Sequence, residues 1–140
     1  MPGLFFEDLS LDQSAQIART VSAADVEAFA AVSGDDNPLH LDEAYAATTP
    51  FKRRIAHGML TGAYISAVLG SRLPGPGAVY VSQTLRFRRP VGLGDEVTTT
   101  VTVRELDPRK GHATFATVCT VAGKTVAEGE AVVLVPKRDA

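Results

Sequence analysis

The longest uncharged stretch of the chain lies between Arg54 and Arg72, where residues 55–71 contain no Asp, Glu, Lys or Arg. A helix over about residues 57–69 would be apolar on nearly all sides, and such a helix is normally buried over most of its surface. A membrane span needs roughly 20 apolar residues, whereas this stretch is interrupted by glycines and polar residues. The pattern therefore predicts a buried helix and no membrane insertion.

The second half of the chain has the alternating and β-branched pattern of strands. Strands are predicted over residues 79–88, 97–103, 112–121 and 125–135. Four consecutive strands joined by short loops are typical of an antiparallel meander. We therefore expect an α+β fold in which a curved antiparallel sheet wraps around the central helix. The exposed sheet edges favour pairing of two copies into a homodimer.

The first third of the chain has one short strand and clear helix signals. Residues 16–21 alternate weakly and predict a strand. Ser22 can cap a following helix, and Asp25 stands where a capping-box acid would. Gly34 ends this helix, because glycine readily takes the left-handed conformation. A second short helix is predicted over residues 41–47.

Composition narrows the possible functions. The chain of 140 residues suits a single domain over residues 1–140, and its net charge of −2 gives no general attraction to nucleic acid. The only cysteine, Cys119, excludes an intramolecular disulfide and a multi-cysteine metal site, so we expect no metal. A lone cysteine fits a reducing compartment, and the N-terminus lacks the pattern of a signal peptide, so we expect a cytoplasmic protein.

The chemistry-bearing residues gather in residues 33–40, with the sequence SGDDNPLH. Asp35 and His40 can converge across a loop in which Asn37 and Pro38 fix the geometry. A carboxylate and an imidazole that converge can hold one water and move its proton. The alternative is a simple polar turn, in which an aspartate caps the next segment and His40 is a core histidine.

Two small residues of the central helix are candidates for substrate binding. Gly58 would lie at the helix N-terminus, where a free N–H can stabilise a carbonyl oxygen that gains charge; alternatively, it only permits close packing. Ser66 lies on the same helix face, where it can line a ligand pocket or bond back to the carbonyl of Gly62.

The order of these motifs resembles one family. Residues 29–42 with their Gly-Asp-x-Asn-Pro-x-His core, the later His57-Gly58-Met59, and the stretches 94–97 and 129–133 closely resemble the MaoC-like (R)-specific enoyl-CoA hydratases. The resemblance covers nearly the whole chain in the right order. It implies the hot-dog fold, which agrees with the fold expected from the hydrophobic pattern.

The resemblance implies a hydro-lyase that adds water to a trans-2-enoyl-CoA and gives an (R)-3-hydroxyacyl-CoA. In the family, the Asp and His of the motif form the catalytic pair, which here are Asp35 and His40. The implied substrate is an acyl-CoA thioester, and no cofactor is implied beyond coenzyme A as part of that substrate. Alternatives are a 3-hydroxyacyl dehydratase acting on acyl carrier protein, a thioesterase, and a non-catalytic partner subunit.

Overall fold

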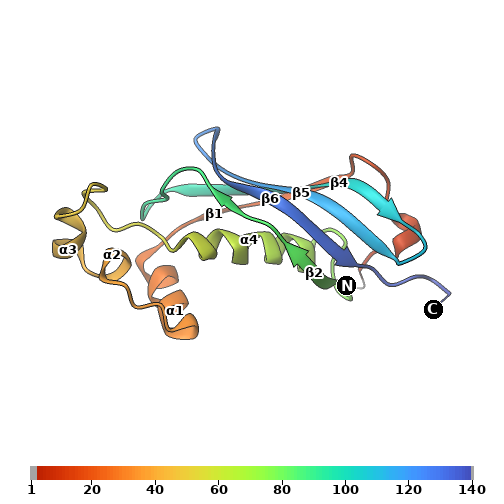
Figure 1. The fold of residues 1–140 in the computed structure, drawn as a ribbon, viewed down its shortest axis with the longest axis horizontal. Helices are drawn as coiled ribbons and strands as arrows, with labels where there is room; N and C mark the ends of the chain where they lie inside the picture. The colour runs from red at the N-terminus through yellow and green to blue at the C-terminus, as the bar shows by residue number, and fades with distance from the viewer. Residues whose placement is uncertain (1–2, 140) are drawn as a thin grey trace.

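The computed structural model describes residues 3–139. Figure 1 shows one antiparallel sheet lying over helix α4, with the short helices α1, α2 and α3 gathered beside the start of α4. In chain order the elements are η1 (Phe6–Asp8), β1 (Ser14–Thr20), α1 (Ala23–Ser33), α2 (Pro38–Leu41), α3 (Glu43–Ala47), α4 (Gly58–Ser71), β2 (Val79–Gln83), β3 (Arg86–Phe87), β4 (Glu96–Asp107), β5 (His112–Val121) and β6 (Lys124–Leu134). No helix within residues 3–139 is long and apolar enough to cross a membrane.

Helix α1 begins and ends as its sequence signals predict. Ser22 Oγ accepts a hydrogen bond from the N–H of Asp25 at 3.1 Å, and the Asp25 carboxylate accepts one from the N–H of Ser22 at 3.3 Å. At the other end Gly34 has a φ of 82°, and its N–H reaches the carbonyl of Ala30 at 2.9 Å. These caps satisfy backbone groups that a helix end leaves free, so they fix where the following polar loop starts.

The sheet order is β1-β4-β5-β6-β2, and β3 also pairs with β6. Strands β4, β5 and β6 form the predicted meander, but the prediction that residues 79–88 precede β4 in the same meander is wrong. The strand β2 pairs with β6, at the opposite edge of the sheet from β1. This order follows from the path of the chain. After β1 and before β2, helix α4 carries the chain across one face of the sheet.

The stretch predicted as one strand over residues 79–88 is divided into β2 and β3. The N–H of Thr84 donates to the carbonyl of Glu130, and Thr84 Oγ1 accepts from the N–H of Glu130. A side chain at Gly129 would collide with the carbonyl of Thr84. Glycine at this position therefore lets the β2–β3 segment approach β6 closely and bend there.

The core lies between α4 and the concave face of the sheet. The buried residues of α4 are Leu60, Thr61, Ile65, Val68 and Leu69. The four apolar residues among them pack in one hydrophobic cluster with alternate residues of β4 and β5, among them Val101, Phe115 and Cys119. The opposite face of α4 is exposed in the single chain, so the expectation of burial on most sides holds for one face only. Curvature of the sheet around α4 is the hot-dog arrangement expected from the sequence.

Candidate active site

The polar loop leaves the end of α1 in a conformation held by its own side chains. Ser33 Oγ accepts a hydrogen bond from the N–H of Asp35 at 3.1 Å, and Asp35 Oδ1 accepts one from the N–H of Asn37 at 3.3 Å. These local bonds favour a turn over continuation of the helix. Asp35 and Asp36 are both exposed, so the carboxylate of Asp35 is open to water.

His40 stands on a short helix that the sequence analysis missed. Residues 38–41 form α2, with Asn37 as its N-cap and Pro38 in its first turn. The Asn37 side-chain oxygen accepts from the N–H of Leu39 at 3.1 Å. Asparagine at the N-cap followed by proline is a favourable helix start, and this explains why residues expected to form only a loop become helical. The helix turns His40 inward, where it is buried.

His40 is anchored by the segment that leads into α4. Its Nδ1 lies 2.7 Å from the carbonyl oxygen of Ile55, and Arg54 Nε donates to the carbonyl of His40 at 2.8 Å. A carbonyl oxygen can only accept, so Nδ1 must carry the hydrogen and Nε2 of the neutral ring keeps its lone pair. The arrangement therefore leaves His40 Nε2 as an available proton acceptor.

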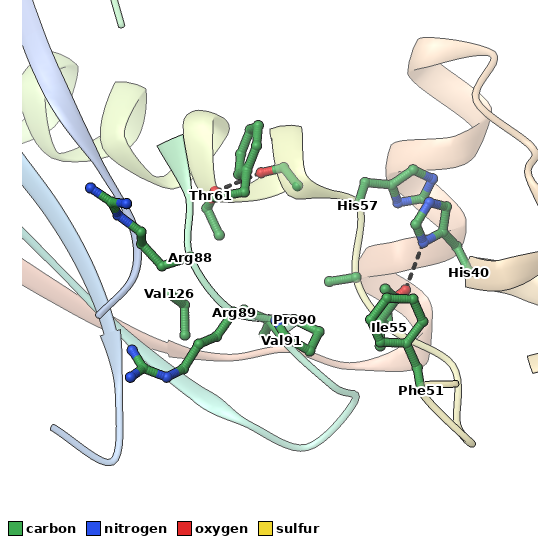
Figure 2. Close-up of a pocket in the computed structure, with 13 residues that line it drawn as sticks. His40, Phe51, Ile55, His57, Thr61, Arg88, Arg89, Pro90, Val91 and Val126 are labelled. Atoms are coloured by element: carbon green, nitrogen blue, oxygen red, sulfur yellow. Dashed lines mark hydrogen bonds between the residues drawn. The ribbon is translucent and has the colours of Figure 1, made fainter. Parts of the chain in front are cut away.

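His57 lies directly against His40 (Figure 2). The two imidazole rings stack with centroids 3.9 Å apart and an angle of 29° between their planes. Phe29 contacts the His57 ring with centroids 4.9 Å apart. His57 Nε2 lies 2.9 Å from the backbone carbonyl oxygen of Asp35, while His57 Nδ1 is buried without a hydrogen-bond partner among the described residues.

Asp35, His40 and His57 each have a carboxylate oxygen or ring nitrogen within 4.8 Å of the other two. A water that accepts or donates hydrogen bonds of about 2.8 Å can bridge atoms at such separations. Each imidazole keeps one nitrogen free. A metal ion still fits less well, because the stacked rings hold these nitrogens in planes only 29° apart, so the two lone pairs do not point to one position.

A pocket of about 390 Å³ opens beside these histidines. Figure 2 shows His40 and His57 at one end of it and Arg88 and Arg89 at the other. The remaining lining is mainly apolar, from Phe51, Ile55, Ala56, Gly58, Thr61, Phe87, Pro90, Val91 and Val126. An apolar pocket with a few polar groups at its end suits a small acyl group whose reactive carbons face the histidines.

The two predicted substrate-binding residues of α4 lie in different places. Gly58 lines the pocket as the first residue of α4, so its N–H has no intrahelical acceptor. A Cβ at Gly58 would lie 3.1 Å from the ring of Phe87, a tight contact, so glycine also eases packing at this position. Ser66 is exposed and does not line this pocket; it lies about 12 Å further along the helix at 1.5 Å per residue.

Several site residues could not be found from local sequence signals. His57 is the N-cap residue of α4, yet it forms no side-chain cap there and contacts the polar loop instead. Arg54 ends a run of three basic residues, 52–54, a pattern typical of solvated surface, but its Nε donates to the carbonyl of His40. Phe87 stands in an alternating pattern, and only the β3–β6 pairing brings it over Gly58.

The fold and site define a hot-dog protein in which His40 lines an apolar pocket and Asp35 has a carboxylate oxygen within 4.8 Å of a nitrogen of His40. The family described as "MaoC like domain" matches residues 9–129, and the chain belongs to this family. The chain is 60% identical over 134 residues to an (R)-specific enoyl-CoA hydratase of Rhodospirillum rubrum, covering 96% of this chain and 93% of that protein.

Two further comparisons agree. A 3-hydroxybutyryl-CoA dehydratase of Methylorubrum extorquens is 52% identical over 136 residues, covering 97% of this chain and 87% of that protein. The solved structure of an R-hydratase from Pseudomonas aeruginosa superimposes with a TM-score of 0.93 at 49% identity, covering 97% of this chain and 88% of the other. The fold and family predicted from the sequence are therefore confirmed.

Proposed function

We propose that this protein is a hydro-lyase that adds water across the C2–C3 double bond of a trans-2-enoyl-CoA and forms an (R)-3-hydroxyacyl-CoA. The observation that carries the proposal is the approach of the Asp35 carboxylate to the His40 ring at the end of an apolar pocket. The names of the relatives that are 60% and 52% identical support the substrate class and both directions of the reaction.

In the proposed mechanism, one water lies between Asp35 and His40. The Asp35 carboxylate accepts a hydrogen bond from this water and orients it. His40 Nε2 removes a proton as the water oxygen bonds to C3, because Nδ1 is committed to Ile55. The C2–C3 π electrons move toward the thioester carbonyl and give an enolate. The imidazolium of His40 then returns the proton to C2, so the pair ends in its starting protonation state.

Gly58 would stabilise the enolate oxygen. Its N–H has no intrahelical acceptor and stands at the positive end of the α4 dipole, next to His57 at the pocket wall. An oxyanion donor of this kind typically contributes about 3–4 kcal/mol to the transition state. The proposed site therefore combines a base and a carbonyl-binding N–H in the lining of one pocket.

A homodimer is proposed from the apolar surface around the free edge of β2. Val79 and Val81 are 56% and 51% exposed, and Met59 and Phe87 are 57% and 53% exposed. The strand β2 pairs with β6 on one side, and no described strand pairs with its other edge. Unpaired edges with apolar side chains are normally covered, and a second copy of the chain would cover this one.

Other features of the proposal come from the sequence and the family. One domain over residues 1–140, a cytoplasmic location and no cofactor besides the coenzyme A of the substrate are proposed on those grounds. Asn37 and Pro38 are proposed to fix the loop, as the cap of α2 supports. Ser66 stays a proposed substrate-binding residue, and its exposed position on α4 suits contact with a longer acyl chain or with the second copy.

The test is product analysis with purified protein and crotonyl-CoA, with crotonyl carrier protein as the comparison. We expect formation of (R)-3-hydroxybutyryl-CoA and the reverse reaction from that product. Higher kcat/KM on the carrier-protein thioester would favour the dehydratase alternative. Release of free coenzyme A without a hydroxyacyl product would indicate a thioesterase, and no turnover of either substrate would indicate a non-catalytic subunit.

A further inference from the structure

His57 joins the two halves of the candidate dyad. Through Nε2 it contacts the backbone carbonyl of Asp35, which is 22 residues earlier in the chain, and through its ring face it contacts His40. It is 2% exposed, and no step of the proposed hydration uses it as an acid or base. We propose that His57 is a positioning residue that sets the separation of the Asp35 carboxylate and His40 Nε2. This inference rests on the proposed hydratase function.

The hydrogen bond to Asp35 fixes the tautomer of His57. The acceptor is a carbonyl oxygen, so Nε2 must donate and the hydrogen cannot lie on Nδ1 of the neutral ring. The 2.9 Å bond restrains the peptide group between Asp35 and Asp36. Movement of this peptide would move the carboxylate with it, because both belong to the same residue.

The ring of His57 also limits where His40 can lie. Stacking at 3.9 Å closes one face of the His40 imidazole, while the bond from Nδ1 to Ile55 fixes its edge. Phe29 of α1 supports the His57 ring at 4.9 Å. The buried His57 side chain, at the N-cap of α4, therefore contacts three separate parts of the site. These are Phe29 of α1, the backbone of Asp35 and the ring of His40 on α2.

The other nitrogen of His57 supports a functional reason for histidine at this position. Nδ1 is buried and has no hydrogen-bond partner among residues 3–139. A buried acceptor without a donor is unfavourable for stability, and such a group in a native protein calls for an explanation. A phenylalanine would fill the same place without an unpaired atom. The donor at Nε2 is the property that phenylalanine lacks, so histidine is explained by the bond to Asp35.

Two variants of His57 test this inference, with crotonyl-CoA hydration as the assay. His57→Phe keeps the aromatic stack and loses the donor, whereas His57→Gln loses the ring and keeps an amide N–H where Nε2 stands. Because a displacement of about 1 Å in a catalytic group can cost about 100-fold, we expect kcat of His57→Phe to fall 10- to 100-fold. KM should stay within about threefold, and the thermal midpoint should equal or exceed that of the wild type. His57→Gln should recover most of the lost kcat.

Val103→Ala is the matched control, because Val103 is fully buried on β4, away from the pocket-lining residues. It should lower the thermal midpoint and leave kcat unchanged. Wild-type kcat in His57→Phe would overturn the positioning role, and so would a loss of kcat that follows a loss of stability. If wild-type protein hydrates no enoyl-CoA, the proposed function fails instead.

The tautomer of His57 gives a readout that needs neither activity nor a variant. Long-range proton–nitrogen NMR spectra of the wild-type imidazoles should show the hydrogen on Nε2 of His57 and on Nδ1 of His40. A hydrogen on Nδ1 of His57 would contradict the bond to Asp35. This measurement tests the hydrogen bond from His57 to Asp35 even if His57→Phe does not fold.

Discussion

Replacing His40 with asparagine would separate the two roles of its imidazole. The Asn side-chain nitrogen occupies nearly the position of His Nδ1, so it can still donate to the carbonyl of Ile55. It has no atom where Nε2 stands, so the proposed proton acceptor is lost. His40→Ala removes both groups, and the comparison of the two variants assigns a cost to each.

The structure sets the expected magnitudes. His40 is 8% exposed and Ile55 9% exposed, so the alanine variant leaves the Ile55 carbonyl buried without its 2.7 Å partner. An orphaned buried acceptor costs about 1–3 kcal/mol, and the asparagine variant should avoid most of this loss. Removal of a general base costs about 10²- to 10⁴-fold in rate. Both variants should therefore lose activity to this extent, and only His40→Ala should also lose stability.

Urea unfolding measures the stability of both variants, and loss of the enoyl thioester of crotonyl-CoA measures the rate. An asparagine variant with more than a tenth of wild-type kcat would refute the assignment of Nε2 as the proton acceptor. Equal destabilisation of the two variants would refute the tautomer assigned from the Ile55 bond.

Three further outcomes are expected. Burial raises the pKa of the Cys119 thiol, so iodoacetamide should modify it at pH 8 only in unfolded protein. Fast labelling of the native protein would contradict this protection of the thiol. The unfolded thiol loses its proton near pH 9 while the folded one keeps it, so the free energy of unfolding should fall as pH rises above 9. Ser22→Ala should lower unfolding free energy by about 1 kcal/mol in urea titrations, because it removes the α1 cap, and an unchanged midpoint would contradict that role. Val81→Arg should convert the proposed dimer to monomer on size-exclusion chromatography, because it places a charge beside the free edge of β2; an unchanged elution volume would exclude this edge from the interface.

Elements whose signals are local could be predicted from the sequence. Ser22, Asp25 and Gly34 act on backbone groups within four residues, and α1 starts and ends where they indicate. The helix predicted from the uncharged stretch agrees with α4 to within two residues at each end. The position of β2 could not be predicted, because it depends on which sheet edge the chain reaches after α4. The break within residues 79–88 depends on a contact with Gly129 that the alternating pattern does not contain.

The same distinction holds for the candidate site. Asp35 and His40 were proposed from one short motif, and the structure brings their side chains within reach of one water. The support for this pair comes from Arg54, Ile55 and His57, which are 14 to 22 residues away in the chain. Their roles depend on the path of the chain into α4, and no spacing rule within the motif indicates that path.

The most direct test of the proposed roles of Asp35 and His40 is the kcat of Asp35→Asn in hydration of crotonyl-CoA, measured beside wild type at saturating substrate. Asparagine keeps an oxygen for the N–H of Asn37 and so preserves the loop bond, but it removes the charge that orients the water. We expect a folded variant in which (R)-3-hydroxybutyryl-CoA forms at least 100-fold more slowly, as expected when a group that positions the reacting water is lost. Formation of this product at the wild-type rate would show that the Asp35 carboxylate is not needed for hydration.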